Sequence, residues 1–203
     1  VNAGPIGVDI LAGAGEAAKV TAFGNGVLLA RVPLFLFQAI QASLLPRLAR
    51  LAAKGDLEEF RDAFFVLLKV VGGVGVLGTA GAALLGPWAL GIMYDGGLDR
   101  RTLTLLALSS GLYMLAVAVA QAVIALHGHR WVAIGWVAGV ASFFSVTAWS
   151  SNDLYLRVEL GLVSGSSVAL AVFAIGLRER FASGSRPDAE SMIDGIPDTI
   201  VDL

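Results

Sequence analysis

The stretch from Gly24 to Arg50, GNGVLLARVPLFLFQAIQASLLPRLAR, decides the fold of this chain. It is long and apolar enough to cross a bilayer, which takes about 20 mostly apolar residues. Four residues interrupt the apolar run: Arg31, Pro33, Gln38 and Gln41. A charged side chain at membrane depth costs about 2.5–3.5 kcal/mol on insertion scales, so such residues usually face a bundle interior or a wet cavity. The stretch therefore predicts a membrane helix that helps to bind or move a polar solute.

The composition of the whole chain is that of a membrane protein. Apolar residues make up 57% and charged residues 15%, and the mean hydropathy is +0.79. Soluble domains contain about 45–50% apolar and about 25% charged residues. The net charge of −2 gives no basic excess to suggest a nucleic-acid partner, and the absence of cysteine excludes disulfides and thiolate metal sites.

Five segments are long and apolar enough to span the bilayer: about Thr21–Leu45, Ala63–Leu85, Leu103–Leu126, Trp131–Ser150 and Tyr155–Leu177. Residues 1–15 resemble the end of a helix whose beginning is missing. From residue 182 the composition changes to Ser, Gly, Pro and Asp, which predicts a disordered acidic tail over 182–203. We therefore expect an all-α polytopic transmembrane bundle over residues 1–181, with about five full spans and a partial first helix.

The Lys and Arg residues of the short loops predict an orientation, because cytoplasmic loops carry an excess of these residues. One side of the bundle holds Arg47, Arg50, Lys54, Arg61, Arg130, Arg178, Arg180 and Arg186. The opposite side holds Lys19, Arg100, Arg101 and Arg157. The first side is therefore expected to be cytoplasmic, together with the C-terminus, in a multi-pass protein of a bacterial plasma membrane.

Arg31, Gln38 and Gln41 follow one another at spacings of seven and three, so they share one face of a continuous helix. Pro33 removes a backbone hydrogen bond and kinks the helix. Broken helices that face a cavity recur in transporters. Arg31 either lines such a cavity, or it snorkels to the outer headgroups or forms a structural pair.

Further polar residues occur in other spans. Tyr113 and Gln121 lie on one face of the third full span, where they either contact a substrate or form interhelical hydrogen bonds. Asp9 lies in the partial first helix, as a coupling carboxylate or as a carboxylate at the outer surface. Arg157 and Glu159 open the last span, and we expect both at the membrane interface.

Glycine pairs predict close helix packing. Gly135 and Gly139 lie four residues apart in the fourth full span, and Gly161 and Gly165 do so in the fifth. Small residues at this spacing let the backbones of membrane helices approach closely. The pattern is generic to helical membrane proteins and does not separate one function from another.

The sequence contains no pattern that argues for an enzyme, a metal site or a cofactor. GxSxG, HExxH and P-loop motifs are missing, and the two histidines, His127 and His129, lie in one loop. The carboxylates of the segment KGDLEEFRD at 54–62 are typical of the solvated first turn of a helix, with Asp56 as its N-cap.

Three features together resemble a known family. They are the segment ASLLPRLARLAAKGDLEEFR at 42–61, the segment ALLGPWALGIMYDGG at 83–97, and the order of helical pairs with short loops. From about Asn2 to Phe181 the chain resembles the C-terminal lobe of oligosaccharide or polysaccharide flippases of the MATE-like exporter superfamily, and its Ala-, Gly- and Arg-rich style is similar to that of actinobacterial members.

The resemblance implies a two-lobed transporter with six helices in each lobe around a central cavity. This chain would supply the end of the seventh helix and the eighth to twelfth helices, and the N-terminal lobe would be its partner. Members are taken to move undecaprenyl-pyrophosphate-linked sugars across the plasma membrane by alternating access. By this resemblance Arg31 would bind the pyrophosphate, and Gln38 and Gln41 would bind sugar hydroxyls.

Three other functions stay open. A cation-coupled multidrug exporter of the same fold would favour carboxylates and aromatic residues in its cavity. An integral-membrane glycosyltransferase or polymerase subunit would need an acidic catalytic loop on the outer side, where the loops here are short. A structural membrane anchor would have little use for Arg31 and the two glutamines.

Overall fold

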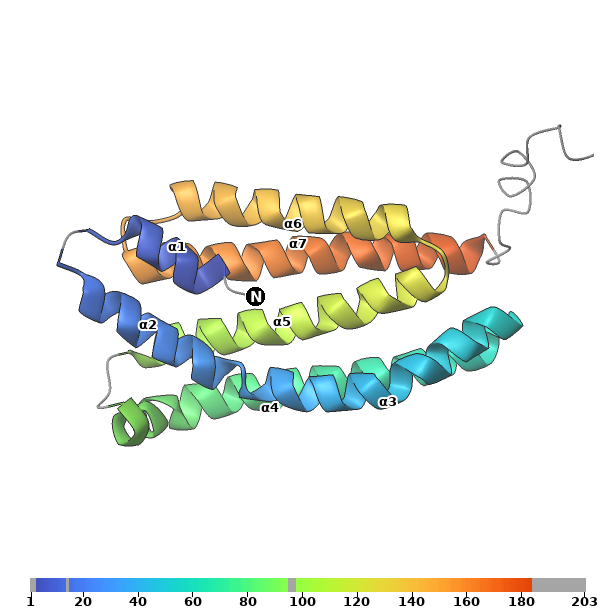
Figure 1. Ribbon diagram of the computed structural model, residues 1–203, viewed down its shortest axis with the longest axis horizontal. Coiled ribbons are helices and arrows are strands. Elements are labelled where there is room, and N and C mark those ends of the chain that lie inside the picture. The colour runs from blue at the N-terminus through green and yellow to red at the C-terminus, as the bar shows by residue number, and fades with distance from the viewer. Residues whose placement is uncertain (1–2, 14, 95–97, 184–203) are drawn as a thin grey trace, which may run out of the picture.

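The computed structural model describes residues 3–13, 15–94 and 98–183. Within these ranges the chain forms seven α-helices and no β-strand (Figure 1). The helices are α1 (Ala3–Leu11), α2 (Ala17–Ala30), α3 (Val32–Lys54), α4 (Leu57–Tyr94), α5 (Arg100–Ala125), α6 (His129–Trp149) and α7 (Leu154–Ala182). The predicted all-α bundle is confirmed. The predicted tail lies outside the described residues from residue 184 onward.

Four of the five predicted spans are confirmed as single helices. Among the described residues, α4, α5, α6 and α7 are each long and apolar enough to cross a membrane. Each begins and ends within a few residues of its predicted span, except α4, which extends further at both ends. The chain is therefore a polytopic helical membrane protein.

The span predicted over Thr21–Leu45, with a kink at Pro33, is divided into two helices at Arg31. Helix α2 ends at Ala30, and α3 begins at Val32 with Pro33 in its first turn. Proline lacks a backbone N–H and fits the first turn of a helix, where that N–H has no partner in the helix. Arg31 joins the two helices, and its N–H still donates to the carbonyl of Val27 at 3.1 Å.

The connections between helices gather at two ends of the bundle (Figure 1). The Gly55 end, as we call it, holds the α3–α4 and α5–α6 turns and the last turn of α7. The Asp99 end holds the α1–α2, α4–α5 and α6–α7 connections. The two ends correspond to the two groups of basic loops that predict the orientation.

A short turn at Gly55 reverses the chain between α3 and α4. Gly55 has a left-handed φ of 73°, which glycine adopts without steric cost. The next residue, Asp56, accepts a hydrogen bond at Oδ1 from the backbone N–H of Glu59 at 3.1 Å. The predicted N-cap at Asp56 is therefore confirmed.

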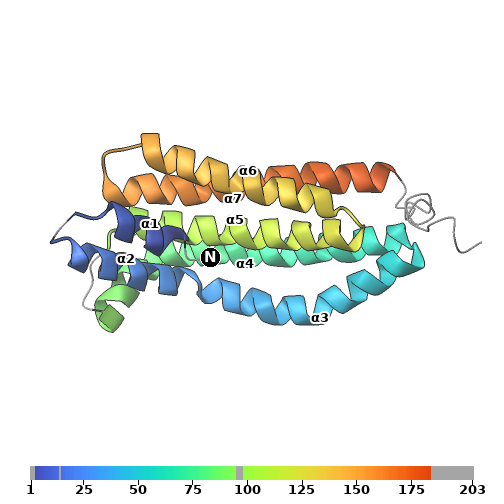
Figure 2. The same cartoon turned by 45° about the horizontal axis from the view of Figure 1, so that its top comes forward.

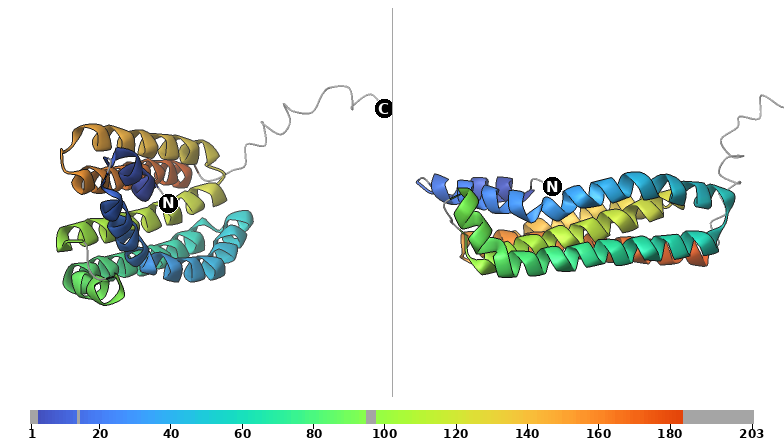
Figure 3. Two further views of the ribbon diagram at one scale, coloured as in Figure 1. Left: turned by 60° about the vertical axis from the view of Figure 1, so that its left-hand side comes forward. Right: turned by 90° about the horizontal axis from the view of Figure 1, so that it is seen from below.

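Helix α5 lies at the centre of the bundle, between α4 on one side and α7 on the other (Figure 2). Its side chains are buried along most of its length, including Met114, Ala116 and Val123. Helix α4 is the longest helix, and the part that follows Pro87 turns away from the rest (Figure 3). The central position of α5 means that a ligand inside the bundle must contact this helix.

Helices α6 and α7 pack through the predicted glycine pairs. A Cβ atom added to Gly139 would lie 2.8 Å from the carbonyl oxygen of Gly165, and one added to Gly165 would lie 2.8 Å from that of Gly139. Both distances are shorter than real Cβ contacts, so a larger residue at either position requires the backbones to move apart. The prediction of close packing is confirmed for this pair of helices.

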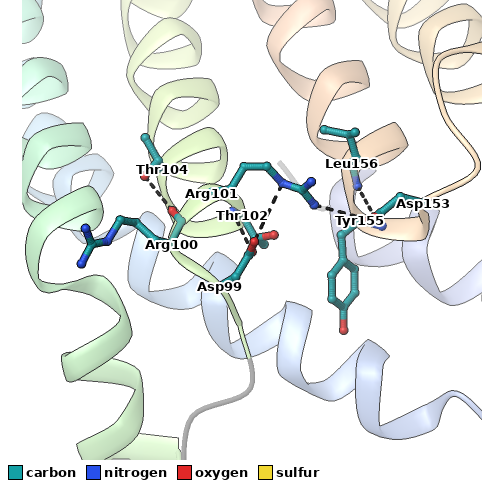
Figure 4. Close-up of polar contacts among 8 residues, drawn as sticks. All are labelled: Asp99, Arg100, Arg101, Thr102, Thr104, Asp153, Tyr155 and Leu156. Atoms are coloured by element: carbon teal, nitrogen blue, oxygen red, sulfur yellow. Dashed lines mark hydrogen bonds and ion pairs between the residues drawn. The ribbon is translucent and has the colours of Figure 1, made fainter.

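An aspartate caps α7 at the Asp99 end (Figure 4). Asp153 accepts hydrogen bonds at Oδ1 from the backbone N–H groups of Tyr155 and Leu156, both at 3.0 Å. Its other oxygen lies 3.5 Å from Nη2 of Arg101. The bond from Leu156, with a smaller effect of Arg101, holds the pKa of Asp153 below its ordinary value.

We expect this cap to make stability depend on acidic pH. Because the folded-state pKa is lowered, the contribution of Asp153 is present above the unfolded-state pKa of about 3.9 and is lost as pH falls through the folded-state pKa. Asp153→Ala should cost about 1 kcal/mol at pH 7. Asp153→Asn should keep the cap but make the loss of stability on acidification smaller. Melting temperatures in detergent between neutral and acidic pH test both; equal pH profiles for Asp153→Asn and the unmodified chain would contradict the assignment.

Candidate functional site

A cavity of about 330 Å³ lies inside the bundle, between α1, α2, α5, α6 and α7. Its lining is predominantly apolar, with Leu, Val, Ala and aromatic side chains. The polar side chains of the lining are Arg31, Ser109, Ser110, Tyr113 and Ser166. Ligand sites are usually apolar cavities of about 300–1,000 Å³ with a few convergent polar groups. This cavity therefore is the candidate functional site.

Arg31 reaches the cavity because of the break between α2 and α3. It caps the C-terminus of α2 and the N-terminus of α3, and its side chain is partly buried. Val27 and Leu34 line the cavity on either side of it in the sequence. The structure thus places Arg31 in the cavity lining.

Tyr113 lines the same cavity from α5, as part of an aromatic wall. Its ring centroid lies 5.9 Å from that of Trp136 on α6. Trp136 in turn packs edge-to-face against Phe173 of α7 at 5.3 Å. These distances are typical of favourable aromatic pairs. Two of the predicted substrate-binding residues, Arg31 and Tyr113, thus meet at one cavity.

Four predicted site residues do not reach this cavity. Gln38 is exposed on α3, Gln41 and Gln121 are partly buried, and Asp9 is exposed on α1; none is among the described residues of the lining. Gln38 and Gln41 follow Arg31 along α3, but neither is among the described residues of the lining. The described lining therefore does not support the predicted contacts of Gln38 and Gln41 with substrate.

Sequence reasoning missed much of the lining. Ser109 is buried and donates a hydrogen bond from Oγ to the carbonyl of Leu106 at 2.8 Å. Trp136, Phe143 and Phe144 contribute from α6. The Ser109–Ser110 pair in an apolar span was the available signal for α5. Nothing in the sequence separates the aromatic residues of α6 from ordinary packing residues.

The charge of the lining limits what the cavity can bind. Among its described residues Arg31 is the one side chain that is ionised at neutral pH. A guanidinium binds carboxylate or phosphate oxygens in a bidentate manner. The arrangement therefore suits an amphipathic anion whose apolar part contacts the cavity walls.

Within residues 3–13, 15–94 and 98–183, no group of three or more His, Asp or Glu side chains is arranged to hold a metal ion. His127 and His129 belong to the turn at the Gly55 end, away from the described cavity lining. The described lining of the cavity thus offers apolar contacts, hydroxyl groups and one cation.

The chain matches no known protein family, no curated protein and no solved structure in sequence or structure comparisons. Its membership of the membrane proteins rests on the four long apolar helices. Function is argued from the cavity and its chemistry.

Proposed function

We propose that this chain is the C-terminal lobe of a MATE-like transporter that moves lipid-linked oligosaccharide or polysaccharide precursors across the bacterial plasma membrane. The observation that supports this function is the position of Arg31, a cation at a helix break that lines an apolar cavity. Intramembrane ionisable groups usually mark the path of a substrate or an ion.

The chemistry of a polyprenyl-pyrophosphate glycan fits the cavity in two respects. The pyrophosphate supplies the anionic oxygens that a guanidinium binds. The adjoining apolar chain fits walls made of Leu, Val and aromatic side chains. Ser110 and Tyr113 add hydroxyl groups that can donate to phosphate or sugar oxygens.

Alternating access requires a second lobe that closes the cavity from the other side. In the proposed transporter an N-terminal lobe does so, and the two lobes rock about the bound ligand. The break at Arg31 provides a point at which α2 can move relative to α3. The Gly55 end and the C-terminus face the cytoplasm in this arrangement, in agreement with the bias of basic loop residues.

A multidrug exporter of the same fold is the second candidate, and the aromatic wall favours it. Tyr113, Trp136 and Phe173 form a continuous set of ring contacts, which suits planar drugs. Cationic drugs, however, are attracted by carboxylates, and the described lining carries a guanidinium instead. The anionic lipid-linked substrate is therefore preferred.

A transport assay separates the two candidates. The chain, joined to the N-terminal lobe that the function requires, is reconstituted in vesicles with a fluorescent polyprenyl-pyrophosphate oligosaccharide. We expect the glycan to become accessible to a membrane-impermeant quencher only in vesicles that contain the protein. Efflux of a cationic dye without glycan movement would instead support the drug exporter, and movement of neither compound would contradict both.

A further inference from the structure

Glu159 is a carboxyl group enclosed within the bundle. It lies in the second turn of α7, near the Asp99 end, and its exposed fraction is 0%. Neither of its oxygens has a hydrogen-bond partner among the described residues. Glutamate is almost never fully buried unless it is paired. The sequence did not indicate that other helices cover Glu159, and its burial requires an explanation.

Thr102 on α5 is the polar side chain with the largest interaction with the carboxyl group of Glu159. Thr102 is also 0% exposed, and its side chain acts on the carboxyl group of Glu159. Its hydroxyl oxygen likewise lacks a partner with hydrogen-bond geometry within the described part of the chain. Three side-chain oxygens of two helices are thus buried near one another, and the hydroxyl of Thr102 is the one hydrogen-bond donor that an unprotonated Glu159 would have in this set.

Arg101 is the cation that attracts the carboxyl group of Glu159, but Arg101 is already paired with the carboxylates of Asp99 and Asp153. Its Nη2 lies 3.5 Å from Oδ2 of Asp153 and its Nε lies 3.9 Å from Oδ2 of Asp99 (Figure 4). Asp99 and Asp153 also act on Glu159, and their negative charges disfavour a third. The other charged or titratable side chains that α7, α1 and α2 bring to this end are Tyr155, Arg157, Asp9, Glu16 and Lys19. Arg157 donates from Nε to the carbonyl of Thr147 at 2.7 Å.

We propose that Glu159 is a proton-binding site between α5 and α7. While the two helices are packed together at the Asp99 end, one carboxyl oxygen carries a proton, so that no charge is enclosed, and the carboxylic acid and the hydroxyl of Thr102 can each donate to the other. Release passes this proton to water and leaves a carboxylate. The charge then lies beside buried apolar residues such as Val158 and Leu103, so it favours separation of the helices and entry of water.

This site goes beyond the proposed transport function, since it depends on no particular substrate. It also differs from the coupling role predicted for Asp9, which is exposed on α1. A proton that is bound with the Asp99 end closed and released with it open makes the opening of this end depend on pH.

Infrared spectroscopy of the full chain in lipid vesicles at neutral pH tests the site. We expect the carbonyl stretch of a protonated carboxylic acid, shifted in D₂O and lost in Glu159→Gln. Glu179→Gln is the matched control, because Glu179 lies exposed on the same helix, and it should keep the band. A spectrum without this band, or a band that Glu159→Gln leaves unchanged, would overturn the proposal.

A second measurement uses the unmodified protein alone and therefore does not depend on how the variant folds. As pH is raised, the protonated-carboxyl band should disappear, and over the same pH interval the amides around Thr102 and Glu159 should exchange hydrogen faster. Loss of the band with no change in exchange at these amides would overturn the link between proton release and helix separation.

Discussion

Replacing Arg31 with Ala is expected to weaken binding of a polyprenyl-pyrophosphate ligand roughly 10- to 100-fold, because hydrogen bonds to charged groups contribute about 1.5–3 kcal/mol. Arg31 is the ionised side chain of the described cavity lining, so the variant leaves the anion with no countercharge there. Arg31→Lys should retain part of the affinity, since lysine keeps the charge but not the bidentate geometry. Binding of a fluorescent ligand to the protein in detergent micelles measures both.

Gln38→Ala is the matched control for Arg31→Ala. Gln38 lies on α3, is exposed, and does not line the described cavity. Its removal should leave affinity unchanged. Equal losses for the two variants would mean that α3 as a whole, and not the cation at the break, determines binding.

Gly139→Leu is expected to destabilise the protein by about 1–3 kcal/mol, the usual cost of inserting methylenes into a packed interior. A Cβ at this position meets the carbonyl oxygen of Gly165 at 2.8 Å and the Cβ of Ala169 at 3.0 Å. Backbone atoms cannot swing aside as a flexible side chain can, so α6 and α7 must separate. Thermal unfolding in detergent, followed by size-exclusion chromatography, measures the loss.

Gly73→Leu is the control for this effect of packing. Gly73 lies exposed on α4, and an added Cβ meets no atom within 4 Å. Leucine is also a better helix former than glycine by up to about 1 kcal/mol. This variant should be as stable as the unmodified protein or more so. A melting temperature lowered equally by both substitutions would contradict close packing of α6 on α7 as the cause.

The spans could be predicted from the sequence because each is a long apolar run, and such runs have few other uses. Pro33 made it possible to predict that the helix is interrupted between α2 and α3, but not the residue at which α2 ends. Pro33 indicated a kink, but the helix ends before it, at Ala30, because proline fits best in the first turn of a new helix. The break leaves Arg31 at the start of α3, and of Arg31, Gln38 and Gln41 only Arg31 is among the described residues of the lining.

The candidate site could be predicted where a residue is unusual for its surroundings. Arg31 and Tyr113 are polar groups in apolar spans, and both line the cavity. Trp136 could not be identified, because an aromatic residue in a span fits packing, lipid contact or a site equally well. The burial of Glu159 could not be predicted, because its position near the start of a span indicates its depth in the membrane and not which helices cover it, and only the packing of α5 on α7 shows its enclosure.

The central claim is that a water-filled, ligand-binding cavity lies beside Arg31, and thiol labelling tests it directly. The 203 residues contain no cysteine, so Ser110→Cys places a single thiol in the cavity lining and Val137→Cys places one on the exposed apolar surface of α6. Thiol reagents react with the thiolate, which requires water. We predict that a hydrophilic reagent labels Ser110→Cys, that polyprenyl-pyrophosphate oligosaccharide slows this labelling, and that Val137→Cys in lipid is inert. Labelling of Ser110→Cys that the ligand leaves unchanged, or no labelling at all, would contradict the account.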